Sequence, residues 1–102
     1  MHNKEAVEKE RELRVKMLEF RKKLISIFTE NYLVLERKRR KKSELLSAHD
    51  TEHTAITEDL ERIKEKEKDI LRRKILISAE LKKIEGEWVK ASLILSLTIR
   101  GG

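Results

Sequence analysis

The chain has 102 residues and a formal net charge of +6, and 43% of its residues are charged while only 4% are aromatic. These values exclude more than one domain and a thick globular core, and they favour long, thin helices. The absence of cysteine excludes a disulfide framework and a thiolate-bound metal. Because the N-terminus is polar and no apolar run approaches membrane length, we expect a soluble, cytoplasmic protein without signal peptide or membrane span.

Residues 4–47 are predicted to form a first long helix. Asn3 can cap its start, and Glu5 places a negative charge in its first turn. Apolar residues recur at helical spacing along it, together with one asparagine: Leu13, Met17, Phe20, Leu24, Ile27 or Phe28, Asn31 and Leu35. The stretch 17–35 is apolar on more than one side, which is typical of a helix covered by several neighbours in a bundle.

Six consecutive bases follow this apolar stretch: Arg37, Lys38, Arg39, Arg40, Lys41 and Lys42. They are candidate phosphate-binding residues, which would make the chain a nucleic-acid-binding helical protein. Six consecutive residues of a helix point all around it, however, and no aromatic side chains are interleaved with them for base stacking. The interpretation that we favour is a solvated face that pairs in part with the acidic segment 57–61.

Residues 48–52 are the predicted turn, because His49, Asp50 and Thr51 are poor helix formers and good capping residues. His49 and His53 have the i, i+4 spacing of two metal ligands on a helix, but no third ligand is evident. We therefore predict no metal site and no cofactor.

Residues 52–96 are predicted to form a second long helix with the clearest pattern of the chain. Ten of twelve positions at alternating steps of four and three are apolar, which is the 3.5-residue repeat of a helix that packs along a partner helix. These positions are Ile56, Leu60, Ile63, Glu67, Ile70, Lys74, Ile77, Leu81, Ile84, Trp88, Ala91 and Leu95. We call such a row the seam of a helix. Glu67 and Lys74 interrupt it, either as a device that selects one alignment or because water enters the seam there.

The predicted fold is an all-α antiparallel helical hairpin, a coiled coil that forms one domain and joins further helices in a bundle. A turn near residue 50 places the apolar block 17–35 beside the apolar block 70–81. It also places the basic run 37–42 beside the acidic segment 57–61. The alternative is one continuous helix in a coiled-coil dimer, since residues 1–85 contain no glycine and no proline.

The C-terminal tail is the most hydrophobic part of the chain. Helix is predicted to about residue 96, with a short strand over 92–99 as the alternative, because Leu93, Leu95, Leu97 and Ile99 alternate with other residues. In a hairpin the tail faces residues 1–13, which offer few apolar side chains to cover it. Its predicted protein-interface residues are therefore Trp88, Val89, Leu93, Leu95, Leu97 and Ile99.

No pattern of catalytic residues is present: the three glycines all lie at or beyond position 86, and no serine or threonine has an evident base beside it. We predict a protein that is not an enzyme and has no small-molecule substrate. The predicted function is that of a coiled-coil adaptor, stalk or assembly subunit, which binds a protein partner or itself through apolar helix faces. Nucleic-acid binding through residues 37–42 is the alternative.

Overall fold

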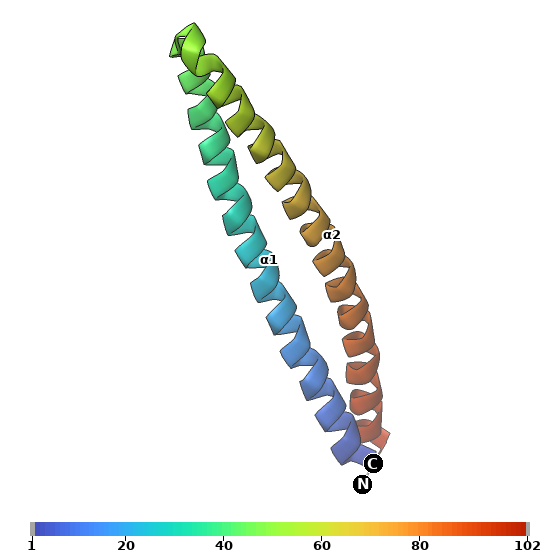
Figure 1. Ribbon diagram of the computed structural model, residues 1–102. Helices are drawn as coiled ribbons and strands as arrows, with labels where there is room; N and C mark the ends of the chain where they lie inside the picture. Colours follow the sequence, from blue (N-terminus) through green and yellow to red (C-terminus); the bar gives the residue numbers. More distant parts are fainter. Residues whose placement is uncertain (1, 102) are drawn as a thin grey trace. The chain divides into compact units, whose positions relative to one another are not determined.

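The computed structural model describes the backbone of residues 2–101 and the side chains of residues 4–98. It contains two helices, α1 (His2–Ser47) and α2 (Asp50–Gly101), and no strand within the described residues (Figure 1). The prediction of an all-α helical hairpin is confirmed, and the alternative of one continuous helix is wrong. Residues 92–99 are helical, so the alternative of a terminal strand is also wrong.

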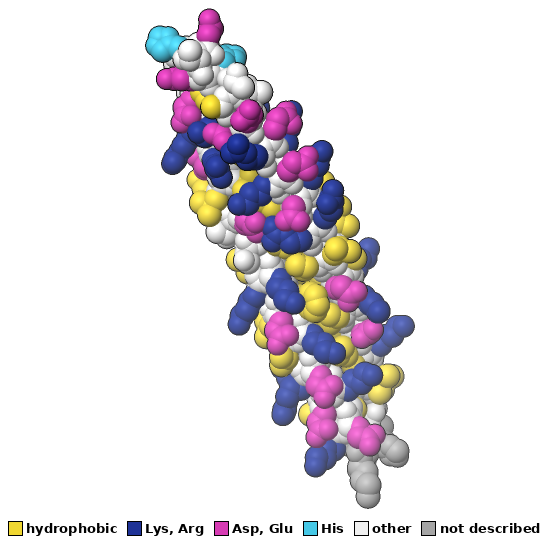
Figure 2. Space-filling view, viewed as in Figure 1, with side chains coloured by type: hydrophobic (Ala, Val, Ile, Leu, Met, Phe, Trp, Pro, Cys, Tyr) yellow, Lys and Arg dark blue, Asp and Glu magenta, His cyan; other side chains and the backbone are white. Residues whose placement is uncertain are grey.

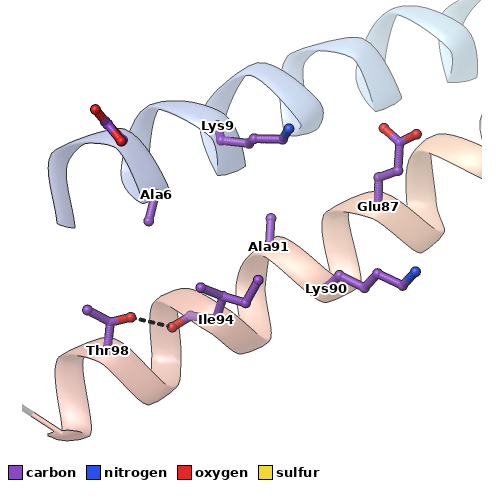
Figure 3. Close-up of a pocket in the computed structure, with 8 residues that line it drawn as sticks. Ala6, Lys9, Glu87, Lys90, Ala91, Ile94 and Thr98 are labelled. Carbon is purple, nitrogen blue, oxygen red and sulfur yellow. Dashed lines mark hydrogen bonds between the residues drawn. The ribbon is translucent and has the colours of Figure 1, made fainter. Parts of the chain in front are cut away.

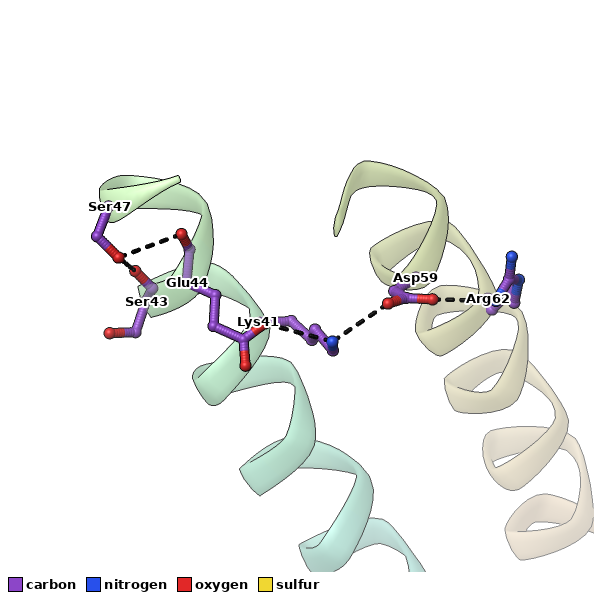
Figure 4. Close-up of polar contacts among 6 residues, drawn as sticks. All are labelled: Lys41, Ser43, Glu44, Ser47, Asp59 and Arg62. Atoms are coloured by element: carbon purple, nitrogen blue, oxygen red, sulfur yellow. Dashed lines mark hydrogen bonds and ion pairs between the residues drawn. The ribbon is translucent and has the colours of Figure 1, made fainter. Parts of the chain in front are cut away.

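The turn between the helices is shorter than predicted and consists of Ala48 and His49. The backbone N–H of Glu52 donates a hydrogen bond of 2.9 Å to the carbonyl of His49, which closes the first turn of α2. Asp50 and Glu52 lie in that first turn, where negative charge is favourable. At the end of α1, the hydroxyl of Ser47 donates a hydrogen bond of 3.3 Å to the carbonyl oxygen of Glu44 in the last turn of the helix (Figure 4).

The helices divide into two compact units, each of which pairs a segment of α1 with a segment of α2. Unit 1 comprises Met1–Leu24 and Leu76–Gly102. Its buried core is formed by Leu13, Met17, Leu81 and Ile84. Four half-buried apolar residues pack against this core: Phe20, Leu24, Trp88 and Ala91. The two segments of unit 1 are therefore held together by side chains that recur at the seam spacing in both helices.

Unit 2 comprises Ile25–Ile75 and includes the turn. Its buried side chains are Ile27 and Val34 from α1 and Ile56, Ile63 and Ile70 from α2. They also follow steps of three and four and their multiples along each helix. Burying a side chain of this size contributes roughly 1.5–3 kcal/mol, so the seam is the main source of stability in both units.

The predicted seam of α2 is confirmed, since eleven of its twelve residues are buried or half-buried and only Lys74 is exposed. In α1 one alternative that the sequence left open is decided, and one position differs from the prediction. Ile27 rather than Phe28 is buried, and Val34 takes the place predicted for Leu35, which is exposed. Alternating steps of four and three from Leu13 lead to Val34, whereas Leu35 lies about 100° further around the helix.

A crosslinking experiment tests the pairing within unit 1. Arg21 and Glu85 form an ion pair of 3.5 Å across the two helices. Because the chain has no other cysteine, Arg21→Cys and Glu85→Cys introduce a unique pair of thiols. We expect a short bismaleimide to join them within one chain, at a yield that does not depend on protein concentration.

Peptide mass spectrometry measures the yield of this link. The control pair is Glu19→Cys with Glu85→Cys, in which position 19 lies on the other side of α1 and should react poorly. A yield that rises with protein concentration would instead show links between chains and would contradict the hairpin.

Candidate interaction surfaces

One side of unit 2 exposes several large apolar side chains, and Lys64 and Lys68 lie on the same side of α2. Phe28 and Leu71 line the same shallow groove between the helices, together with Lys74, and the groove has a volume of about 270 Å³. The ammonium of Lys74 lies 5.2 Å from the centre of the Phe28 ring, close enough for a cation–π contact. The side chain of Lys74 is therefore exposed and lies over part of an aromatic ring. This contact explains why a lysine is tolerated at a seam position.

Further exposed apolar residues continue this side along both helices. Relative to Phe28, Ile25 is three residues before, Tyr32 is four after and Leu35 is seven after, so all lie on the same side of α1. On α2, Ile75 is four residues after Leu71, so these two also lie on one side of their helix. We define the apolar face of unit 2 as Ile25, Phe28, Tyr32, Leu35, Leu71 and Ile75, each of which is exposed. Figure 2 shows that hydrophobic side chains also lie at the surface of the molecule, among charged ones.

The opposite side of unit 2 is charged. A second groove is lined by Glu30, Leu33, Val34, Arg37, Ile63 and Lys66. On this side the guanidinium of Arg73 lies 2.7 Å from the carboxylate of Glu30. The hydrogen bond from Arg73 lowers the pKa of Glu30, and the same bond raises the pKa of Arg73. Unit 2 is thus two-sided, with exposed apolar side chains on one side and a cross-helix ion pair on the other.

The basic run is divided between the seam and the surface. Lys38 and Lys41 are half-buried at seam positions, and both reach acidic residues of α2. Lys41 lies 3.2 Å from Asp59, and the hydrogen bonds to Asp59 and Glu44 raise the pKa of Lys41 (Figure 4). Arg37, Arg39, Arg40 and Lys42 are exposed, and Arg39 pairs with Glu36 of its own helix. The prediction that residues 37–42 bind phosphate stays a prediction.

The predicted match between the basic run and the acidic segment 57–61 holds for Asp59. The other two acids of this segment pair within α2, Glu58 with Arg62 and Glu61 with Lys64. Glu67 is half-buried in the seam, as the sequence pattern predicts, and lies 3.0 Å from the ammonium of Lys38. Its Oε1 atom is buried and lacks a hydrogen bond of good geometry, although Lys38 also donates a hydrogen bond of 3.4 Å to Oε2.

The predicted interface residues of the tail lie on different sides of α2. Trp88 is half-buried in the seam of unit 1, and its indole N–H donates a 3.0 Å hydrogen bond to Glu10. Leu95 is also half-buried, whereas Val89, Leu93 and Leu97 are exposed. The side chain of Ile99 lies outside the described residues. Ile94 of the same tail is also exposed.

A hollow lies beside the tail, between the helices of unit 1. Its volume is about 640 Å³, and it is lined by Glu5, Ala6, Lys9, Glu87, Lys90, Ala91, Ile94 and Thr98. Figure 3 shows Ala6 and Ala91 facing each other across this space. Two alanines cannot fill the distance that leucine or isoleucine fills elsewhere in a seam, so the interior of unit 1 is open here.

The histidine pair meets no third potential metal ligand within the described part of the chain. His49 is in the turn and His53 is in α2, and both side chains are exposed. No group of three or more potential ligands is present among the described residues. Neither described helix contains a stretch long and apolar enough to cross a membrane.

Comparison of the chain with protein families, with curated proteins and with solved structures finds no match. The candidate surfaces therefore rest on the geometry of this chain.

Removal of the Glu30 carboxylate should make stability less sensitive to acid. Because the folded-state pKa of Glu30 is lowered, the Glu30–Arg73 pair stabilises the fold above the ordinary glutamate pKa of about 4.3. That contribution disappears as the pH falls through the lowered pKa. We expect Glu30→Gln to be less stable than the wild type at pH 7 and equally stable at low pH.

Thermal unfolding followed by circular dichroism between pH 7 and pH 2 measures this difference. Glu58→Gln is the control, because Glu58 is exposed and its ion pair with Arg62 has the long distance of 3.9 Å. A Glu30→Gln curve parallel to that of the wild type would show that the pair does not contribute.

The contact between Lys38 and Glu67 should appear as energetic coupling. Glu67→Leu leaves the half-buried ammonium of Lys38 without its partner, so we expect this variant to be destabilised. The double variant Lys38→Leu with Glu67→Leu should regain stability, because two apolar side chains suit a seam position. The coupling free energy from urea unfolding should be on the order of 1 kcal/mol, and additive effects of the two substitutions would contradict it.

Proposed function

We propose that this chain is a non-catalytic helical-hairpin subunit, which binds a protein partner or another copy of itself through apolar helix faces. The observation that carries the proposal is the tail of α2. Between Trp88 and Thr98 the only charged residue is Lys90, and large apolar side chains occur on every side of the helix. A helix that is apolar all around is typical of a buried element, yet Leu97 is 69% exposed here.

The segment of α1 that faces the tail cannot cover these side chains. Glu5, Ala6 and Lys9 line the hollow from the α1 side, and they are small or charged. On the α2 side Ile94 borders the hollow, while Leu93 and Leu97 lie exposed one turn apart. An apolar surface next to an unfilled hollow suits a partner helix whose large side chains enter the hollow.

Serine substitutions in the tail test this proposal. Val89, Leu93 and Leu97 are exposed, so changing all three to serine removes apolar surface without emptying the core of unit 1. We expect the variant to keep the helical circular dichroism of the wild type and to form a smaller assembly. Size-exclusion chromatography with light scattering measures the mass.

Leu46→Ser is the matched control, because Leu46 is 91% exposed but lies next to the turn. It should assemble as the wild type does. If the tail variant also keeps the wild-type mass at every concentration, the tail is not a surface for self-association.

A further inference from the structure

We propose that the apolar face of unit 2 binds the same face of a second copy of this chain, about a two-fold axis parallel to the helices. Two hairpins then form a four-helix arrangement in which α1 of one copy lies antiparallel to α2 of the other. This inference rests on the proposed function, because it names another copy as the partner, but it uses a different surface from the tail.

The spacing of the apolar face calls for a helical partner. Ile25, Phe28, Tyr32 and Leu35 follow one another at steps of three, four and three, the same alternation as in the seam of α1. A row of this kind fits another helix with the same repeat, because side chains at this spacing interlock with a facing row. On α2 the row consists of Lys64, Lys68, Leu71 and Ile75, of which the last two are apolar. A second copy therefore supplies apolar side chains opposite the Ile25 and Phe28 end of the α1 row and lysines opposite the other end.

The size of the apolar face is sufficient for a dimer. Its six residues are between 45% and 63% exposed. They present on the order of 600 Å² per copy, and a face-to-face pair would bury on the order of 1,200 Å², the lower bound of stable interfaces. A single patch of that size is also at the upper end of what monomeric proteins leave exposed.

Charge decides the orientation of the two copies. Arg39 is seven residues after Tyr32, and Glu61 is fourteen before Ile75, so both lie on the side of the apolar face. The ion pair of Lys41 with Asp59 shows that these parts of α1 and α2 lie at the same level. With the two-fold axis parallel to the helices, Arg39 of each copy comes within about one turn of Glu61 of the other.

The opposite side of unit 2 does not suit a second copy equally well. It carries the Glu30–Arg73 ion pair, with Arg37 and Lys66 along the adjoining groove, so close approach of two copies would desolvate these charges. Leu33 is the exposed apolar residue that lines this groove. The two sides of unit 2 therefore predict different effects for adjacent residues of α1.

Tyr32 and Leu33 provide a matched pair for the test. Both are 62% exposed, but Tyr32 is on the apolar face and Leu33 is on the charged side. The experiment uses the full chain, with mass and dimer dissociation constant measured by sedimentation and light scattering over a concentration series. We expect a wild type that is a dimer or a larger assembly, at least a tenfold higher dissociation constant for Tyr32→Glu, and no change for Leu33→Glu.

Ile75→Glu on α2 repeats the test should Tyr32→Glu fail to fold, as judged by circular dichroism. Arg39→Glu should weaken the dimer, and adding Glu61→Arg should restore it, which distinguishes the proposed orientation from others. A monomeric wild type, equal effects at positions 32 and 33, or no effect of Tyr32→Glu and Ile75→Glu would each overturn the inference.

The tail variant separates this inference from the proposed function. If the triple serine variant alone reduces the mass, the tail is the self-association surface and the inference about unit 2 fails. If Tyr32→Glu alone reduces it and Leu33→Glu does not, unit 2 holds the dimer and the tail has no part in it.

Discussion

The structure depends on one constraint: each helix carries an apolar seam that must be covered by another helix. Nine large apolar side chains are buried in the described part of the chain, and they come from α1 and α2 in both units. The intervening positions are dominated by charged residues, which cannot enter a core without partners. The cross-helix contacts of Lys38 with Glu67 and Lys41 with Asp59 follow from this constraint, because seam positions near the turn bear charges that need opposite charges across the pair.

The fold was predictable from the sequence because the spacing of the α2 seam continues from Ile56 to Leu95, with apolar residues at every position except Glu67 and Lys74. The position of the turn was also predictable, from poor helix formers and from the matching of apolar and charged blocks. Which individual residue of an apolar stretch is buried was harder to predict. Val34 and Leu35 are both apolar, and only the exact steps of three and four from Leu13 decide which of them is buried. A composition that is rich in leucine, valine and isoleucine cannot make that distinction.

The candidate surfaces were predictable only in part. Whether a side chain is exposed depends on how the two helices are rotated about their axes, which the sequence does not state directly. The sequence shows that residues 17–35 are broadly apolar. It does not show that Phe28 and Leu71 line one groove while Glu30 and Arg73 pair on the opposite side. The tail shows the same dependence on helix rotation. Trp88 and Val89 are adjacent, but Val89 is exposed while Trp88 is half-buried in unit 1 and donates a hydrogen bond to Glu10.

The two-residue turn also has a consequence for the order of folding. Unit 2 contains the turn, so its first cross-helix contacts close a short loop, whereas the two segments of unit 1 are separated in sequence by the whole of unit 2. The entropy lost on closing a loop grows with its length, so unit 2 should form first and unit 1 should close afterwards. The tail of α2 belongs to the part that closes last, and its apolar side chains are thus accessible to a partner before the hairpin is complete.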